Sequence, residues 1–343
     1  MKKFIKNNRV FIIAEAGVNH NGKLPLAKKL ADRAKEAGCD AVKFQTFKAK
    51  NLVSSKANLA AYQKKNRSNG AKNQLELIKE LELSFEDFKA LKAYCDRKGI
   101  LFLSTPFDYE SVDLLLRLGV PAFKISSGEV NNIPFLQYVA GKRKPVILST
   151  GMSSLAEVKE AARVILGCGN KDLILLHCTT EYPTPFSGVN LKAMDTLRKT
   201  FNVLVGYSDH TLGIEVAIAA AARGACVIEK HFTLNRNFPG PDHKSSLEPD
   251  ELKKMVAAIR NVEESLGDGI KKPAKCEQKN IPIVRKSLVA AREIPRGEVI
   301  TMDKIAVKRP GYGIVPGKIN KVIGLRARTN IKIDEVITWE LIA

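Results

Sequence analysis

The sequence predicts an α/β protein: a (β/α)8 TIM barrel followed by a small all-β domain. Three observations carry this prediction. Short apolar runs alternate with amphipathic segments, eight such runs occur before residue 230, and beyond residue 284 the chain changes to strand-like pieces divided by glycine and proline. A chain of 343 residues, 45% of them hydrophobic, can build one large core and a smaller second domain.

The eight apolar runs have the length and the β-branched content of buried strands. They are Val10–Ala14, Ala41–Phe44, Ile100–Leu103, Ala122–Ile125, Val146–Leu148, Leu173–Leu176, Val203–Gly206 and Ala225–Ile228. Amphipathic stretches of helical spacing lie between them, among them Leu24–Ala37, Phe85–Lys98, Tyr109–Leu118, Leu155–Leu166 and Leu191–Thr200. Eight strands in strict alternation with helices close a barrel. An open doubly wound sheet is the alternative, and no G-x-G-x-x-G motif follows the first strand to support it.

The segment Val203–Phe232 shows how the predicted strands bring chemistry together. Its two apolar runs end in polar clusters, and the alanine-rich stretch Gly213–Arg223 between them is typical of a crossover helix. Such a crossover places both strand ends at the same edge of a parallel sheet. His210 and His231 are then expected to face one space, either as two metal ligands or as an acid–base pair.

Polar side chains follow all eight predicted strands. In a TIM barrel the active site is assembled from residues just past the carboxyl ends of the strands. In chain order, these ends carry Glu15 with Asn19, His20 and Asn21; Lys43 with Gln45; Ser104 and Thr105; Lys124 with Ser126 and Ser127; Ser149; His177 with Tyr182; Ser208 with His210; and Glu229 with His231. One such residue is unremarkable in any barrel, but eight polar ends together indicate an active site.

The residue types at these ends indicate what the site binds. Two lysines, several hydroxyls and glycine-flanked turns suit a phosphate or a carboxylate. Two histidines with carboxylates nearby suit a divalent metal such as Mn²⁺, Mg²⁺ or Co²⁺, with coordination positions left open for substrate. We therefore expect a phosphorylated acid as one substrate and a metal-polarised carbonyl on the other.

The net charge of +20 raises the possibility of nucleic-acid binding. The excess is spread, with +6 on residues 285–343 and +14 on the rest, so there is no basic tail. The densest stretch, Phe47–Asn73, has no acidic residue and is interpreted as a solvated surface or as a loop that attracts an acidic substrate. Neither nucleic acid nor membrane is the expected partner.

Cysteine usage and hydropathy predict a cytoplasmic protein. The six cysteines are scattered singly without a CxxC motif, and no apolar run approaches 18 residues. The predicted domains are a catalytic barrel over residues 1–267, a linker over 268–284 and the small all-β domain over 285–343. A turn-rich loop carrying Asp242 follows the last barrel strand, and the helix Glu251–Leu266 is expected to close the barrel.

Motifs spread over nearly the whole chain resemble the sialic (nonulosonic) acid synthase family, whose members are similar to a TIM barrel followed by an antifreeze-like (SAF, β-clip) domain. The segments that carry the resemblance are Ile13–Gly22, Val42–Thr46, Ser104–Phe107, Phe123–Glu129, Ser149–Met152, His177–Pro183, Gly206–His210, Glu229–Phe232, Gly240–Asp242 and Lys308–Gly311. Together they are highly specific.

The resemblance implies a transferase that joins phosphoenolpyruvate to an open-chain N-acetylmannosamine-type sugar and releases phosphate. The implied phosphoenolpyruvate contacts are Lys43, Ser104, Lys124, Ser127, Ser149 and Ser208, and the implied sugar contacts are Glu15, Gln45, Tyr182, Asp242 and Arg309. His210 and His231 would hold the metal, for which Mn²⁺ is expected. Glu15, Lys43, Lys124 and Glu229 form the implied catalytic set, with Glu229 activating water.

The resemblance also implies a domain-swapped homodimer, in which Arg309 of one subunit reaches the sugar in the other subunit's site. The pair Thr179-Thr180 is similar to relatives that make legionaminate, whereas some N-acetylneuraminate-forming relatives have an asparagine there. The choice between N-acetylmannosamine and its 2,4-diacetamido counterpart stays open, and pseudaminate synthases look more distant.

The sequence fits two other classes of protein less well. A synthase that uses a sugar phosphate should have further arginines at its strand ends, and they are missing here. A nucleic-acid-binding or ice-binding protein would leave the eight polar strand ends unexplained.

Overall fold

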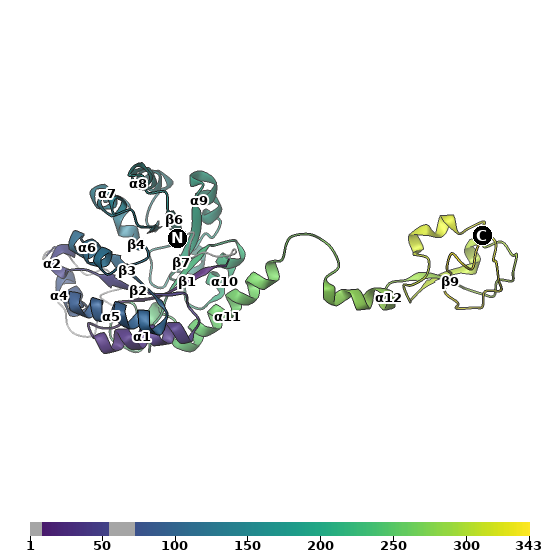
Figure 1. Cartoon of the computed structure of the whole chain (residues 1–343), viewed down its shortest axis with the longest axis horizontal. Coiled ribbons are helices and arrows are strands. Elements are labelled where there is room, and N and C mark those ends of the chain that lie inside the picture. Colours follow the sequence, from purple (N-terminus) through teal and green to yellow (C-terminus); the bar gives the residue numbers. More distant parts are fainter. Residues whose placement is uncertain (1–8, 55–72) are drawn as a thin grey trace. The chain divides into compact units, whose positions relative to one another are not determined.

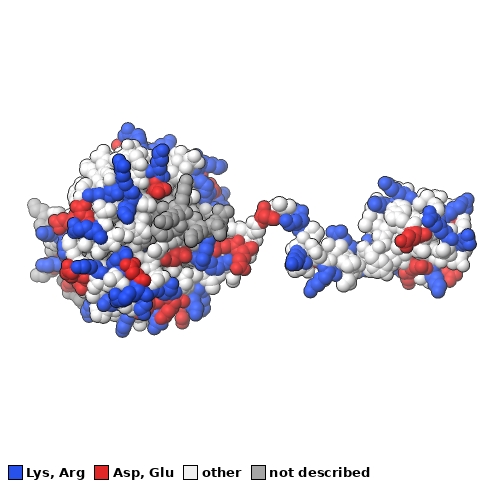
Figure 2. Space-filling model, in the orientation of Figure 1, with Lys and Arg blue, Asp and Glu red and all other residues white. Residues whose placement is uncertain are grey.

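The computed structural model describes residues 9–54 and 73–343 and divides into two compact units, Met1–Gly267 and Asp268–Ala343. Figure 1 labels their helices and strands, and Figure 2 shows basic and acidic side chains interspersed on the visible face of each unit. Most of the basic stretch predicted within residues 47–73 lies outside the described residues. None of the helices in the described ranges is long and apolar enough to cross a membrane.

The first unit is built on an eight-stranded sheet whose strands pair in parallel in the order β3-β2-β1-β8-β7-β6-β5-β4. The two strands at the ends of this order, β3 and β4, also contact each other, so the sheet curls into a barrel. The strands are β1 (Phe11–Gly17), β2 (Ala41–Thr46), β3 (Leu101–Pro106), β4 (Phe123–Ile125), β5 (Val146–Ser149), β6 (Leu173–His177), β7 (Leu204–Asp209) and β8 (Val227–His231). The predicted TIM barrel is confirmed.

Several strands continue past the apolar runs that predicted them. The first was expected to end at Ala14 but runs to Gly17, and the last was expected to end at Ile228 but runs to His231. Polar residues interrupt the apolar pattern there, while the backbone ladder continues, since Glu15 pairs with Lys43 on one side and with His231 on the other. Residues expected in loops, such as Glu229, are therefore held by the sheet.

Helices surround the strands and are fixed at their ends by local sequence signals. They are α1 (Leu24–Glu36), α2 (Ala49–Leu52), α4 (Gln74–Glu80), α5 (Phe85–Lys98), α6 (Tyr109–Arg117), α7 (Ile133–Gly141), α8 (Leu155–Gly167), α9 (Ala193–Phe201), α10 (Glu215–Ala222) and α11 (Pro249–Leu266). Ser84 with Asp87, and Ser154 with Glu157, form capping boxes at the starts of α5 and α8. Gly99 ends α5 in the left-handed conformation, at φ 68°.

The barrel has two apolar layers because successive strand residues point to opposite faces. On β1, Ile12 and Ala14 pack outwards with the helices, whereas Phe11 and Ile13 join a separate cluster inside the barrel. The inner cluster also contains Ala41, Leu103, Ala122, Ile147, Ile174, Leu176 and Val227. Gly206 belongs to this crowded interior, where an added Cβ would lie 2.5 Å from the carbonyl oxygen of Val227. The inner layer fills the barrel beneath the polar strand ends.

The second unit has its own small core. Strands β9 (Ser287–Ala290) and β10 (Ile305–Lys308) pair antiparallel, and isolated bridges such as Val289 to Val336 join the remaining extended pieces. The predicted strand-like pieces around Glu298 and Arg326 meet in one such bridge and are not full strands, since turns divide the chain too closely for longer ladders. The segment between the two predicted domains forms a 3₁₀ helix (Lys275–Asn280) and α12 (Ile281–Val284) within this unit. The prediction of a small all-β domain is confirmed.

Candidate active site

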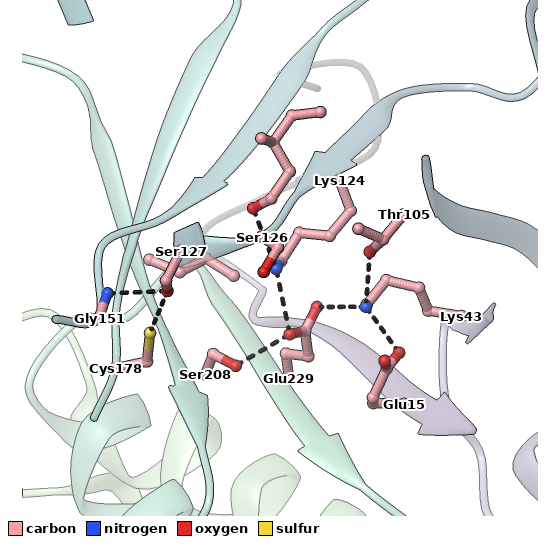
Figure 3. A network of polar contacts seen from close by, with 12 residues as sticks. Glu15, Lys43, Thr105, Lys124, Ser126, Ser127, Gly151, Cys178, Ser208 and Glu229 are labelled. Carbon is pink, nitrogen blue, oxygen red and sulfur yellow. Dashed lines mark hydrogen bonds and ion pairs between the residues drawn. The ribbon is translucent and has the colours of Figure 1, made fainter. Parts of the chain in front are cut away.

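Four charged side chains meet inside the barrel, directly above the inner apolar layer. Lys43 Nζ lies 2.7 Å from Glu15 Oε2 and 3.7 Å from Glu229 Oε2. Lys124 Nζ lies 3.4 Å from Glu229 Oε1. All four side chains are at most 4% exposed. Figure 3 shows the carboxylate of Glu229 between the two ammonium groups, with Glu15 on the far side of Lys43.

The alternation of side chains along each strand explains why these residues share one space. On β8 the inward Val227 is followed two residues later by Glu229, and on β2 the inward Ala41 is followed by Lys43. The same count takes Ile13 to Glu15 and Ala122 to Lys124. On each of these strands, the charged side chain is therefore the next one that points into the barrel after the apolar layer.

Burial and mutual charge separate the protonation behaviour of the two carboxyl groups. For Glu15, burial outweighs the attraction of Lys43 and raises the pKa to about 7. For Glu229, burial is overcome by the ammonium groups of Lys124 and Lys43, so its pKa falls to about 2. Burial disfavours charge on both lysines, but the neighbouring carboxylates raise the pKa of Lys43, whereas that of Lys124 is lowered. Near neutral pH, Glu229 is thus a fixed anion and Glu15 can hold or release a proton.

Hydroxyl groups and a thiol surround this ion cluster. Ser208 Oγ donates to Glu229 Oε1 at 2.9 Å, and Ser127 Oγ accepts from the Gly151 amide at 2.8 Å. Ser149 Oγ is buried and has no hydrogen-bond partner in residues 9–54 and 73–343. The cavity above the cluster is lined by Glu15, Lys43, Gln45, Thr105, Phe107, Lys124, Ser126, Ser127, Ser149, Cys178, Tyr182, Ser208, His210, Glu229 and His231. Donors and cations dominate this surface, as expected for a site that takes an anion.

One predicted contact is not brought to the cavity. The hydroxyl of Ser104 is fully buried and lies 2.6 Å from Thr46 Oγ1, on the outward side of the strand next to Phe102. The following residue, Thr105, lines the cavity instead and accepts a hydrogen bond from Lys43 Nζ at 3.0 Å. Because Leu103 points inward, the two-residue repeat brings Thr105 inward and turns Ser104 away.

Four lining residues were given no contact by the sequence analysis: Thr105 and Ser126, which it named only among the polar strand ends, and Phe107 and Cys178. Thr105, Ser126 and Cys178 could have been assigned to the cavity from the same repeat, since Leu103, Ala122 and Leu176 precede them at even spacing on the inner face. No comparable signal exists for Phe107, which lies in the loop after β3.

The two predicted metal-ligand histidines lie side by side at the ends of β7 and β8. Their ring centroids are 5.4 Å apart, and the ring of Tyr182 stacks on His210 at 4.3 Å. His210 Nδ1 lies 2.6 Å from the carbonyl oxygen of Thr179, so Nδ1 carries the proton and Nε2 is an acceptor, with the hydroxyls of Tyr182 and Ser208 each 3.4 Å away. His231 Nδ1 is buried, has no hydrogen-bond partner within the described part of the chain and lies 3.9 Å from Asp242 Oδ2.

These histidines fit a divalent metal. Burial lowers the pKa of His210 to about 4 and also lowers that of His231, so both imidazoles are neutral and keep lone pairs for a cation. In the described ranges, no three His, Cys, Asp or Glu side chains converge to hold a metal. If a metal binds here, the two imidazoles would be its ligands from the described residues, and substrate and water would complete the coordination.

The predicted sugar-side residues differ in their placement. Gln45 Nε2 donates to Glu15 Oε1 at 3.4 Å, and Tyr182 also lines the cavity. Asp242 is buried beside His231, and burial raises its pKa to about 6. Arg309 is an exposed residue directly after β10 in the second unit, and its contact with a sugar stays a prediction.

Comparisons with known proteins agree with this architecture. The NeuB family model matches residues 30–271, and the SAF domain model matches residues 285–343. An N,N'-diacetyllegionaminic acid synthase from Campylobacter jejuni is 53% identical over 96% of this chain and 99% of its own length. A protein of the same name from Legionella pneumophila is 48% identical over 96% of this chain and 94% of its own.

Solved structures include an N-acetylneuraminic acid synthetase from Leptospira borgpetersenii. It is 37% identical to this chain, with a TM-score of 0.72, and the match covers 80% of this chain and 91% of that one.

Proposed function

Because the chain belongs to the NeuB family and carries a SAF domain, we propose that it is a phosphoenolpyruvate-dependent nonulosonic acid synthase acting on a 2,4-diacetamido sugar. The product would be an N,N'-diacetyllegionaminic acid. This corresponds to the legionaminate alternative of the sequence analysis, which the names of the relatives from Campylobacter and Legionella favour over N-acetylneuraminate. Under this proposal the reaction provides an acidic sugar for a surface polysaccharide.

The observation that carries the proposal is the placement of Glu229 between Lys43 and Lys124, beneath two neutral imidazoles. The two ammonium groups and the hydroxyls of Ser127, Ser149 and Ser208 would hold the phosphate and the carboxylate of phosphoenolpyruvate. No arginine is among the described residues that line the cavity, which argues against a second substrate carrying its own phosphate.

His210 and His231 would hold a divalent cation, Mn²⁺ by preference, and when bound this cation would polarise the aldehyde oxygen of the sugar. In the bond-forming step, C3 of phosphoenolpyruvate attacks the aldehyde carbon, which leaves positive charge at C2. Water then adds to C2 and phosphate leaves with cleavage of its C–O bond. Glu229, held as an anion, would stabilise the charge at C2 and orient that water.

Glu15 is the group suited to proton transfer at neutral pH, because its pKa is raised to about 7. Gln45 and Tyr182, which line the cavity, and Asp242, which lies beside His231, would contact the sugar. In this proposal the active unit is a domain-swapped homodimer, in which Arg309 of one subunit contacts the sugar bound to the other.

The test is release of inorganic phosphate by the purified full-length protein given phosphoenolpyruvate and Mn²⁺. Parallel reactions contain 2,4-diacetamido-2,4,6-trideoxymannose, N-acetylmannosamine or no sugar. We expect rapid release with the first sugar, slower release with the second and none without sugar or after chelation of the metal. Faster release with N-acetylmannosamine would identify the protein as an N-acetylneuraminate synthase instead. No phosphate release with either sugar would overturn the proposal.

A labelling experiment tests the bond that is broken. Phosphoenolpyruvate with ¹⁸O in the bridging position should transfer the label to phosphate, because the C–O bond is cleaved. Label retained in the sugar acid would contradict the proposed step.

A further inference from the structure

A second buried ion pair lies on the outer face of the barrel, away from the cavity. Lys230 Nζ is 2.7 Å from Asp209 Oδ2, and both side chains are fully buried. Lys230 Nζ also donates to the carbonyl oxygen of Thr211 at 2.6 Å. The other carboxylate oxygen, Asp209 Oδ1, accepts from the amide of Thr211 at 2.9 Å and from its hydroxyl at 2.8 Å. All three residues are held in one network.

This network is placed directly behind the two histidines. Asp209 and Lys230 are register partners on β7 and β8, and each immediately precedes a histidine in the sequence. Because strand side chains alternate, an outward pair at Asp209 and Lys230 accompanies inward imidazoles at His210 and His231. The backbone of His210 lies between Asp209 and Thr211, inside the turn that the carboxylate closes.

The remaining contacts of His210 come from another loop. Its ring is held by the Thr179 carbonyl, and its own carbonyl accepts from the amide of Thr184 at 2.9 Å. Among the described residues, His231 Nδ1 has no hydrogen-bond partner, while its carbonyl accepts from the amide of Leu247 at 2.9 Å. The ring of His231 therefore depends on the strand register for its position relative to His210. Two side-chain contacts join β7 and β8 near the histidines, the hydrogen bond from Ser208 to Glu229 inside the barrel and the Asp209–Lys230 pair on its outer face.

We propose that Lys230 and Asp209 are positioning residues that fix the spacing and orientation of His210 and His231 for a divalent metal. The inference rests on the proposed function for the identity of the bound group. Burying two charges is costly, and a well-packed neutral pair usually serves stability equally well. The benefit of the charged pair here is geometric, because its hydrogen bonds specify one register and one turn.

The test compares Mn²⁺ dissociation constants, measured by electron paramagnetic resonance on purified full-length proteins. The variant D209N/K230M removes both charges together and keeps an acceptor for Thr211. The matched control, D40N/R260M, neutralises an ion pair of 2.9 Å between Asp40, the residue before β2, and Arg260 of α11, at the amino-terminal end of the barrel strands. Circular dichroism establishes that each protein is folded.

We expect D209N/K230M to bind Mn²⁺ about 10- to 100-fold more weakly than the wild type, which is the usual effect of losing a residue that orients a metal ligand. D40N/R260M should bind Mn²⁺ as tightly as the wild type does. Equal affinity in D209N/K230M and the wild type would overturn the inference, as would equal weakening in both variants or a wild type that binds no Mn²⁺. If the double variant does not fold, T211V carries the test. It removes only the hydroxyl that donates to Asp209, and the inference requires a several-fold weaker affinity.

Phosphate release is measured on the same samples to separate the two proposals. A wild type that binds Mn²⁺ but releases no phosphate with either sugar would end the proposed function, while the comparison of Mn²⁺ affinities would still decide the positioning role.

Discussion

Glu15 and Lys43 form an ion pair of 2.7 Å across the neighbouring strands β1 and β2, where the two residues are register partners. Both side chains are almost fully buried. The cation therefore has a carboxylate partner within the protein itself, and an incoming anion must share Lys43 with Glu15 and Glu229. Under the proposed function, stability and catalysis depend on the same three side chains, and substitutions can separate the two effects.

The first prediction concerns Lys43→Met, which leaves Glu15 and Glu229 buried with less compensating charge. We expect the free energy of unfolding to fall by about 3 to 5 kcal/mol, the usual cost of breaking a buried pair, and turnover to be lost. Adding Glu15→Gln removes one of the uncompensated carboxylates, so the double variant should recover stability but not turnover. Urea unfolding at pH 7.5 and phosphate release measure the two effects. A double variant no more stable than the single one would contradict this account.

The second prediction compares the neighbours Thr105 and Ser104. Thr105→Val removes the acceptor of Lys43 Nζ inside the cavity and should raise the KM for phosphoenolpyruvate about 10- to 100-fold, the value of a hydrogen bond to a charged group. Ser104→Ala removes a hydroxyl that contacts only Thr46, so it should cost about 1 kcal/mol of stability and leave this KM unchanged. Steady-state kinetics and urea unfolding of both variants provide the check. A raised KM for phosphoenolpyruvate in Ser104→Ala would contradict this prediction and show that Ser104 contributes to the site.

The third prediction concerns acid stability and His20. The side chain is buried against Phe44, Nδ1 accepts from the Gly22 amide, and burial lowers the pKa of His20 from 6.5 to about 4. A histidine with a lowered pKa in the folded state contributes stability above pH 6.5 that is lost as the pH falls towards 4. His20 alone should account for about 2 kcal/mol of the loss between pH 8 and pH 5.

His20→Gln should therefore show a smaller drop over this range. Unfolding is followed by far-ultraviolet circular dichroism in the presence of chelator, because the single tryptophan, Trp339, belongs to the second unit. An equal drop in both proteins would exclude His20 as a source of the acid sensitivity.

The fourth prediction concerns Arg309 and the proposed sharing of the site. Arg309→Ala should raise the KM for the sugar about tenfold or more, as expected for loss of a hydrogen bond from a charged group, and leave the KM for phosphoenolpyruvate unchanged. Arg292→Ala is the matched control, because Arg292 is an exposed residue of the same unit that pairs with Asp303. An unchanged sugar KM in Arg309→Ala would refute the role.

Subunit mixing tests the domain swap directly. His231→Ala and Arg309→Ala should each be inactive or weak, but their mixed dimers contain one site with both residues intact. Coexpression should therefore restore about a quarter of wild-type activity, the fraction expected for random pairing of two subunits. Activity no higher than that of the separate variants would show that both residues belong to the same chain's site.

The sequence was sufficient for the barrel, since the rhythm of apolar runs reflects burial on both faces of parallel strands. It was also sufficient to name Lys43, Lys124 and Glu229 as members of one polar layer. Ser104 was counted among the polar strand ends, together with Thr105, because the apolar pattern stops at Leu103, and the family resemblance implied its contact with phosphoenolpyruvate. Backbone pairing continues through polar residues, and only the inward or outward direction distinguishes Ser104 from Thr105.

The same reason explains why the role of Lys230 and Asp209 was not predicted. In the sequence both appear as polar residues beside the site histidines, equal in kind to Ser208 and Glu229. Whether such a residue faces the cavity or the helices changes with a shift of one residue along the strand, which composition does not reveal. The structure shows that Lys230 and Asp209 face outward, and on our proposal they position the histidines.

The apolar layer inside the barrel also bears on the order in which reactants bind and products leave. Beneath the ion cluster, Phe11, Ile13 and their neighbours fill the interior of the barrel. On β8, Glu229 lies one inward position deeper than His231. Under the proposed function, a reactant bound by the lysines would therefore have to bind before the reactant at the histidines, and the phosphate it leaves behind would be released last. The order of binding and release would then follow from depth.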